Sequence, residues 1–219
     1  MTFHDRLAKA VGRPLFWVVL VGLLTGVPLA LQVAQDQPAI PGIFAKLPEF
    51  ELVDQDGKAF DLARMTGRIW IADFIFTRCP TLCVALSERM SSLQLRLKNS
   101  NREIQLVSFS VDPEHDTPAR LRDYAKRFHA MPWVWTFVTG ALGAMETVVV
   151  EGFKIAMDKN EDAPADDIMA ITHGSKFVLI DRKGRIRGYY DDEEASVNRM
   201  LKDAAVIANV EQDRIRTAM

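Results

Sequence analysis

The feature that most constrains this chain is an apolar segment that leads directly into two closely spaced cysteines. Residues 69–76 (Ile-Trp-Ile-Ala-Asp-Phe-Ile-Phe) are β-prone and predict a buried strand. Cys79 and Cys83, the two cysteines of the sequence, follow this segment. From Thr81 to Asn99, apolar residues recur near helical spacing and predict a helix. The sequence therefore predicts a strand, a cysteine loop and a helix in direct succession.

This order predicts that the cysteines lie at the amino end of the helix. Pro80 suits the first helical position, because its missing N–H has no partner to lose there. Cys79 is then expected at or beside the N-cap, and Cys83 one turn further along the same face. The helix dipole and the unpaired N–H groups favour thiolate. Such a pair can close a disulfide, supply two soft ligands to one metal ion, or remain as inert core thiols.

Strand and helix patterns alternate along the rest of the chain. Further strands are expected at 50–53, 59–62, 104–111, 135–139, 153–157, 176–180 and 186–190, and helices after Thr117, from 141 to about 150 and from about 194 to 208. This pattern predicts an α/β fold with a central mixed β-sheet flanked by helices. The amino end of the cysteine helix then opens at the carboxyl edge of the sheet, where ligands bind in open α/β sheets.

An acidic loop follows the strand expected at 104–111. It contains Asp112, Glu114 and Asp116, whose oxygens could suggest a site for a hard cation. Their spacing matches no complete oxygen-ligand loop. We therefore expect a solvated loop whose last residue, Thr117, caps the next helix.

The amino-terminal part contains a charge-free apolar run at residues 15–34. Its length is close to the roughly 20 residues that cross a bilayer. Arg6, Lys9 and Arg13 precede the run, so the amino terminus is expected in the cytoplasm and the following domain in the periplasm or an equivalent space. A retained anchor is favoured over a cleaved signal peptide, because the cleavage positions lack suitable small residues. We expect a cytoplasmic segment at 1–13, a single transmembrane helix at 14–34, a linker at 35–46, a folded domain at 47–209 and a tail at 210–219.

Two thiolates rarely complete a metal site, so a histidine is the natural third ligand. His4 is expected on the other side of the membrane, and His129 suits a helix C-terminus. His115 lies in the acidic loop and remains possible. His173 precedes the strand expected at 176–180, and in a thioredoxin-like layout its loop faces the amino end of the cysteine helix. The predicted topology therefore favours His173.

Three separated motifs occur in an order that resembles a known family. They are Phe76–Cys83 (FTRCPTLC), Ser110–Pro118 (SVDPEHDTP) and His173–Asp181 (HGSKFVLID). With the apolar run before them, they resemble the Sco/SenC copper chaperones over about residues 47–208. The resemblance implies a thioredoxin-like fold, copper bound by Cys79, Cys83 and His173, and a role in assembling cytochrome c oxidase. The implied partners are the copper-site subunit of the oxidase and other copper chaperones or thiol reductants.

Thiolates suit Cu(I), and imidazole suits both Cu(I) and Cu(II). A closed zinc site would need a fourth ligand, and the sequence has no further cysteine. The chaperone interpretation describes a carrier and not an enzyme. The main alternative is an enzyme, a tethered thiol–disulfide oxidoreductase that reduces the copper-ligand cysteines of its client through Cys79 and Cys83. A peroxidase of the peroxiredoxin kind and an anchored domain with an idle disulfide also stay open. The net charge of −2 gives no reason to expect a nucleic-acid partner.

Overall fold

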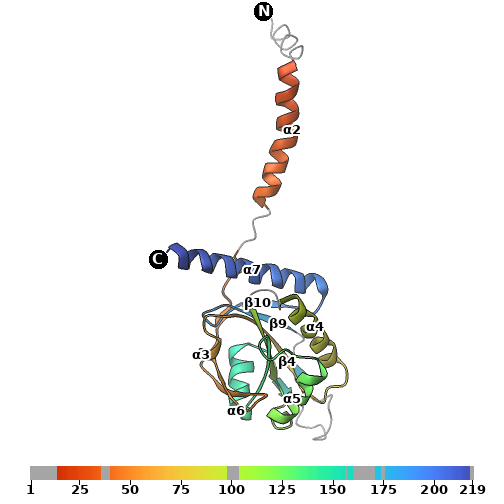
Figure 1. Cartoon of the computed structure of the whole chain (residues 1–219), viewed down its shortest axis with the longest axis vertical. Coiled ribbons are helices and arrows are strands. Elements are labelled where there is room, and N and C mark those ends of the chain that lie inside the picture. Colours follow the sequence, from red (N-terminus) through yellow and green to blue (C-terminus); the bar gives the residue numbers. More distant parts are fainter. Residues whose placement is uncertain are drawn as a thin grey trace, which may run out of the picture. The chain divides into compact units, whose positions relative to one another are not determined.

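A computed structural model describes residues 14–35, 40–97, 104–155, 157–159, 171–173 and 176–217 (Figure 1). The chain divides into two compact units, Met1–Ala39 and Ile40–Met219. The first unit contains α2 (Pro14–Gln35), a helix of 22 residues without a charged side chain. Within the described residues, no helix combines the length and the hydropathy of a membrane span.

The second unit is built on an eight-stranded sheet with the order β1-β10-β9-β4-β5-β6-β2-β3. Its strands are β1 (Ala45–Lys46), β2 (Glu51–Asp54), β3 (Ala59–Asp61), β4 (Ile69–Ile75), β5 (Ile104–Ser110), β6 (Trp135–Thr139), β9 (Phe177–Ile180) and β10 (Arg185–Tyr190). Strands β4, β5 and β6 are parallel, and the other neighbours pair antiparallel. The predicted mixed sheet is thus confirmed.

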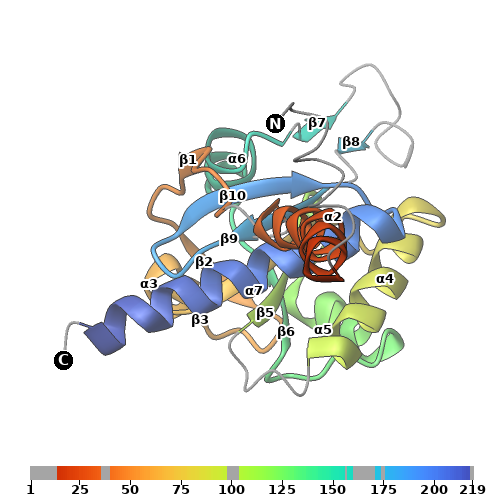
Figure 2. The ribbon, with the colours of Figure 1, turned by 90° about the horizontal axis from the view of Figure 1, so that it is seen from above.

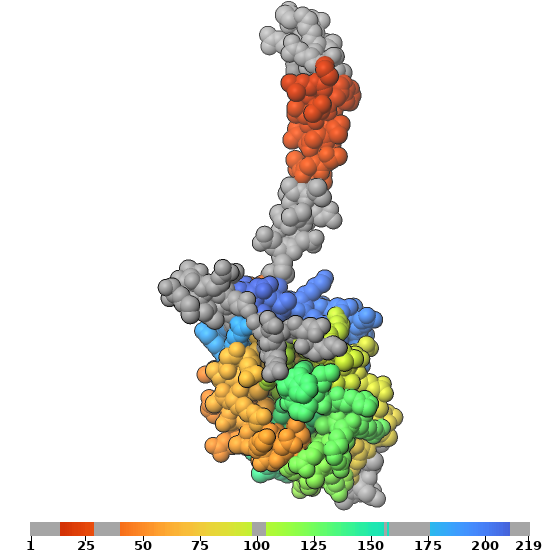
Figure 3. Space-filling view, in the orientation of Figure 1, coloured from red at the N-terminus to blue at the C-terminus, as the bar shows by residue number. Residues whose placement is uncertain are grey.

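Helices precede, connect or follow the strands. They are α3 (Leu62–Met65), α4 (Leu82–Leu97), α5 (Pro118–Arg127), α6 (Leu142–Glu146), the π-helix η1 (Thr147–Gly152) and α7 (Glu194–Thr217). A separate two-stranded sheet joins β7 (Met157–Lys159) to β8 (Ile171–His173). Figure 2 shows α4 and α5 together on one side of the main sheet and α6 on the other. In Figure 3, the orange segment that contains the β2–β3 hairpin lies beside green segments from the middle of the chain. Inside the domain, β2 pairs with β6.

The side chains of β4 alternate between two buried layers. Trp70 and Phe74 lie in an aromatic layer, where Phe74 is 5.2 Å from Phe153 between ring centroids. Asp73 faces the other layer, under α4 and α5, because its partner Ser108 shares a face with the β6 residue Phe137, which contacts α5. Every residue of β4 is buried, as expected for a central strand with helices on both sides.

Several predicted boundaries differ from the structure for local reasons. The strand predicted at 59–62 ends at Asp61, because this side chain caps α3 by accepting the N–H of Arg64 at 2.7 Å. The helix predicted at 141–150 is α6 followed by the π-helix η1, which ends at Gly152. The strand predicted at 153–157 is wrong in position, since β7 begins at Met157. Helix α7 extends beyond the predicted end at 208.

Residues 40–46, which the sequence suggested as the end of a linker, belong to the second unit. The N–H of Phe44 donates to the carbonyl of Ile186 at 2.9 Å, and β1 then pairs with β10. The guanidinium group of Arg187 donates to the carbonyl of Pro41, with Nε at 3.1 Å. The segment is therefore held along the outer side of β10.

Candidate functional site

The cysteine loop connects the carboxyl end of the central strand β4 to helix α4. The helix begins at Leu82, and the carbonyl of Thr81 accepts the N–H of Ala85 at 3.1 Å. The sequence predicted that Pro80 is the first helical residue. This is wrong, because α4 begins two residues later. Instead, the N–H of Cys79 donates to the carbonyl of Phe76 at 3.2 Å, and this turn keeps Cys79 outside the helix. The cysteines still lie at the amino end of α4.

Cys79 and Cys83 come together at this end, and neither is in a disulfide. Their exposed fractions are 7% for Cys79 and 0% for Cys83. The N–H of Cys83 donates to Sγ of Cys79 at 3.5 Å, so the first turn of the helix directs a backbone donor at the first sulfur. Two sulfur atoms are thus available within one short loop and the start of one helix.

The pKa values of the two thiols are shifted in opposite directions. Burial raises the pKa of Cys79, but the N–H groups of Cys83, Thr81 and Leu82 outweigh burial, so this pKa lies below the ordinary value. Burial raises the pKa of Cys83 well above its ordinary value, and the charges of Cys79 and Asp73 add to this effect. Cys79 is therefore the stronger candidate for a thiolate at neutral pH.

Asp116 fastens the cysteine loop to the loop after β5. Its carboxylate accepts the N–H of Thr77 at 3.1 Å, the hydroxyl of Thr77 at 2.5 Å and the hydroxyl of Ser110 at 2.7 Å. Asp116 is fully buried, so the expectation of a solvated position is wrong for this residue. Burial raises its pKa, although these hydrogen bonds oppose the shift. Asp116 is buried because it is the acceptor for these donors, two of which belong to the cysteine loop.

Asp112 forms a second link between the same two loops. Its carboxylate accepts Nε of Arg78, the residue before Cys79, at 2.7 Å, and it is buried as well. Glu114 is exposed, as expected. The hydroxyl of Thr117 accepts the N–H of Arg120, which confirms the predicted cap of α5. The acidic loop thus supports the cysteine loop.

A buried polar layer lies between the sheet and helices α4 and α5. Nε1 of Trp135 donates to Oγ of Ser108 at 2.8 Å, and Ser108 donates to Oδ1 of Asp73 at 2.5 Å. Oδ2 of Asp73 has no hydrogen-bond partner among the described residues. Burial raises the pKa of Asp73 to about 7, although the Ser108 bond lowers it. Asp73 was not predicted to have a role beside the cysteines, although a single charge within an apolar strand was an available signal.

Helix α5 contributes the other polar contact of this layer. The hydroxyl of Tyr124 donates to the carbonyl of Cys83 at 3.2 Å. Because this uses its one proton, the hydroxyl of Ser87, at 2.9 Å, donates to Tyr124. The backbone of the second cysteine is thereby tied to α5.

The histidines lie at different places. His173 is the last residue of β8, opposite Met157, where the sequence predicted a loop; its side chain lies outside the described part of the structure. His4 also lies outside the described residues. His115 remains in the acidic loop, and His129 follows the end of α5 with φ of 55°. Within the described residues, no group of three or more His, Cys, Asp or Glu side chains is placed to hold a metal ion.

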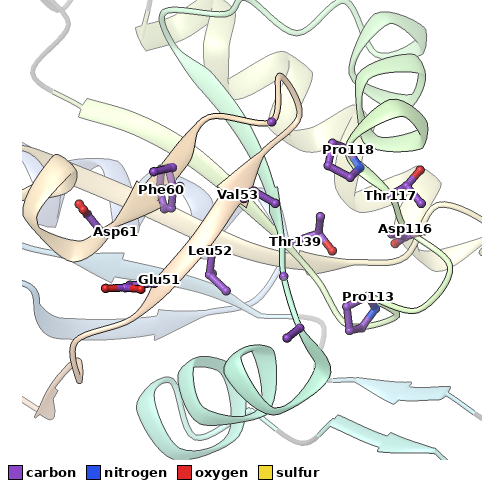
Figure 4. A pocket seen from close by; sticks show the side chains of 14 residues that line it. Glu51, Leu52, Val53, Phe60, Asp61, Pro113, Asp116, Thr117, Pro118 and Thr139 are labelled. Atoms are coloured by element: carbon purple, nitrogen blue, oxygen red, sulfur yellow. The ribbon is translucent and has the colours of Figure 1, made fainter.

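A groove of about 860 Å³ lies on the other side of the acidic loop. Figure 4 shows Leu52 and Val53 of the β2–β3 hairpin across from Asp116 and Thr117, with Thr139 between them. The acidic loop, whose Asp116 accepts hydrogen bonds from Thr77, therefore also forms one wall of this groove.

Comparison with known proteins gives consistent matches. The SCO1/SenC family profile matches residues 42–209. The SCO1 protein homolog of Bacillus subtilis (strain 168) is 34% identical over 146 residues, which cover 66% of this chain and 73% of the relative.

Solved structures agree with these matches. A SCO1/SenC family lipoprotein from Bacillus anthracis str. Ames is 30% identical, with a TM-score of 0.67 over 79% of this chain and 98% of that chain. BsSco, described as a member of the Sco family of cytochrome c oxidase assembly proteins with a disulfide switch, is 30% identical, with a TM-score of 0.64 over 81% and 97% of the two chains. Copper-bound ScoI of Bradyrhizobium japonicum, 23% identical over 74% and 99% of the chains, shares the fold with a TM-score of 0.63. Together with the family profile, these matches show that the chain belongs to the SCO1/SenC family.

Proposed function

We propose that this protein is a copper chaperone that binds one copper ion through Cys79, Cys83 and His173 and delivers it to the copper centre of cytochrome c oxidase. The observation that carries the proposal is the pair of reduced sulfurs at the start of α4, where Sγ of Cys79 accepts the N–H of Cys83. Two soft sulfur donors fit Cu(I), and an imidazole would extend the donor set to Cu(II). The family membership and the oxidase-assembly role described for BsSco support the choice of client.

The topology of β9 supports His173 as the third ligand. Strand β9 runs antiparallel to β4, with Val178 level with Ala72. The amino end of β9 therefore lies at the carboxyl edge of β4, the edge from which the cysteine loop emerges. His173 precedes Phe177, the first residue of β9, by four positions, so its backbone stays within about 14 Å of that residue.

A site with three protein ligands leaves copper accessible to a receiving protein. Copper must enter the reduced pair, because a Cys79–Cys83 disulfide offers no thiolate. Each cysteine must lose its proton before it binds copper. The lowered pKa of Cys79 favours this residue as the first ligand.

We also propose that residues 14–34 anchor the domain in a membrane, with the amino terminus in the cytoplasm and the domain in the periplasm. In support, α2 has no charged residue, and Leu15, Val18 and Leu24 are more than half exposed. Such a surface is stable in an apolar surrounding.

Thiol–disulfide exchange is the second candidate, and the unequal acidities of the two cysteines favour it. The Cys79 thiolate would attack a client disulfide, form a mixed disulfide and release one client thiolate. Cys83 would then lose its proton and attack Sγ of Cys79, which releases the second client thiolate and leaves a Cys79–Cys83 disulfide. An external thiol reductant would restore the reduced pair.

The copper proposal is tested by titrating the reduced protein with Cu(I) against a coloured chelator and by recording the Cu(II) absorption spectrum. His173→Ala should weaken binding by more than about tenfold, because it removes a ligand. The matched control is His115→Ala, which should bind like the wild type. If His115→Ala loses copper and His173→Ala does not, the ligand assignment is wrong. Retained binding in both Cys79→Ser and Cys83→Ser would defeat the chaperone proposal.

The exchange reaction has its own signature. Cys83→Ser should accumulate a mixed disulfide between Cys79 and the client in the absence of copper, because the resolving thiol is missing. Cys79→Ser serves as the control and should trap none.

A further inference from the structure

The segment at residues 40–44, here called the entry segment, exposes apolar side chains although it belongs to the folded domain. Ile40 is 49% exposed, Ile43 is 56% exposed and Phe44 is 65% exposed. The segment contains no charged residue. A group of large apolar side chains exposed on a fixed part of a surface marks a site of contact with a protein or a membrane.

The entry segment is fixed by buried groups. Arg187, which donates to the carbonyl of Pro41, is itself buried and lies 3.0 Å from Oδ2 of Asp181. The ring of Phe44 packs edge-on against Tyr189, with 5.7 Å between ring centroids. The apolar side chains therefore keep a defined direction relative to the sheet.

The strand pairing shows from which edge of the sheet the chain enters. Ala45 is level with Ile186, Ile186 with Ile180, and Ile180 with Trp70. Each of these three pairings is antiparallel, so β1 runs antiparallel to β4. Phe44 precedes β1, and the entry segment therefore arrives from the carboxyl edge of β4. This is the edge from which the Cys79 loop emerges.

The chain between the predicted anchor and the entry segment is short. Four residues, 36–39, separate the end of α2 at Gln35 from Ile40. Even fully extended, this chain reaches no more than about 18 Å. The polar layer of a bilayer extends roughly 6 Å beyond the hydrocarbon on each side. The entry segment therefore has to stay close to the lipid surface if residues 14–34 span the membrane.

We propose that the entry segment lies in the interfacial layer of the membrane. It would hold the domain so that the carboxyl edge of β4, where the Cys79 loop emerges, faces the lipid surface. This inference rests on the membrane anchor proposed above. Ile43 and Phe44 supply the kind of apolar and aromatic contact that favours the interface. The cysteine site would then reach acceptor sites that lie near the bilayer surface and not sites far above it.

The test uses the full chain in phosphatidylcholine nanodiscs that contain a lipid with a nitroxide on its headgroup. Paramagnetic broadening of backbone amide signals reports the distance from the lipid surface. We expect the strongest broadening at Phe44, intermediate broadening at Thr81 in the cysteine loop and the weakest at Trp133. Trp133 is a matched internal control, because it is 55% exposed and precedes β6, which is parallel to β4, so it lies at the opposite edge of the sheet.

The double variant Ile43→Ser, Phe44→Ser should keep the chain in the nanodisc and reduce the difference between Thr81 and Trp133. Equal broadening at the two edges of the wild-type domain would overturn the inference and leave the anchor intact. A chain that does not enter the nanodisc at all would overturn the anchor, and this inference with it. Unchanged amide spectra of the variant outside the entry segment would show that its domain is folded.

Discussion

At the scale of single residues, the two cysteines differ in pKa because they take different positions at the amino end of α4. Sγ of Cys79 lies in front of the first N–H groups of α4, which stabilise a negative charge. Cys83 is within the first turn and fully buried, so its ionisation would create a negative charge that water does not solvate and that nearby donors do not fully stabilise. A soft metal ion supplies that compensation. Copper binding should therefore release a proton from Cys83 in particular.

Asp73 makes the stability of the domain depend on pH. Its pKa is raised to about 7 in the folded protein from an ordinary 3.8, so it contributes stability that is complete below pH 3.8 and is lost as pH rises through 7. The shift corresponds to a loss on the order of 4 kcal/mol. Asp73→Asn should remove most of this loss, because Asn carries no charge and its Oδ1 can still accept from Ser108.

The measurement is the free energy of unfolding in denaturant at pH 5 and pH 8. We expect the wild type to lose stability between these values and Asp73→Asn to lose much less. Asp123→Asn is the control, because Asp123 is an exposed carboxylate of α5, and it should follow the wild type. Equal pH dependence in the wild type and Asp73→Asn would contradict a buried titrating carboxylate.

At the scale of elements, the loops after β4 and β5 act as one unit, because Asp116 and Asp112 join them. Thr77→Val removes the hydroxyl that donates to Asp116 and leaves a buried carboxylate oxygen with one donor fewer. We expect a loss of about 1–3 kcal/mol in stability. We also expect a higher pKa of Cys79, because the loop that holds its sulfur before the helix N–H groups loosens.

The second effect is measured as the pH dependence of alkylation of Cys79 in a Cys83→Ser background. Thr147→Val is the control, since it removes a hydroxyl whose exposed hydrogen bond runs to the carbonyl of Gly143, one turn earlier in α6. If Thr77→Val lowers stability and leaves the alkylation profile unchanged, the hydrogen bond between Thr77 and Asp116 supports the fold and does not position the thiol.

The same scale shows what the sequence can and cannot predict. The structure confirms β4, β5 and β6 to within one residue, because each is a short run of mainly apolar and β-prone residues, nearly all of them buried. β1 was not predicted, since its two residues are a strand only through pairing with β10, far along the chain. The π-helix η1 was not distinguished from an α-helix, because an apolar run this short fits either helical spacing.

The sequence likewise predicts some features of the candidate site and not others. Spacing and neighbouring elements were sufficient to predict the cysteine pair at a helix start and the cap at Thr117. They did not predict the burial of Asp116 or Asp112, because burial depends on which loop a folded chain brings against them. The assignment of His173 remains a prediction.

At the scale of the whole molecule, the boundary between the two units has a testable consequence. Removing residues 1–39 should leave the stability of the domain unchanged, because the second unit begins at Ile40. Removing residues 1–46 should lower it by about 2–4 kcal/mol, since β1 and the hydrogen bonds to Arg187 and Ile186 are lost at roughly 1 kcal/mol each. Urea unfolding of the two truncated chains checks this, and equal stabilities would contradict a structural role for the entry segment.

The position of β4 in the sheet also sets a sequence of events for a newly made chain. One neighbour of β4 is β5, which follows soon after it, but the other is β9, which begins only at Phe177. Until the ribosome has passed β9, the strand that leads into the cysteine loop has one side without a partner. The cysteine loop that follows β4 is thus completed as a site only after β9 has been made, and we expect chains that end before Phe177 to lack the buried environment of Cys83.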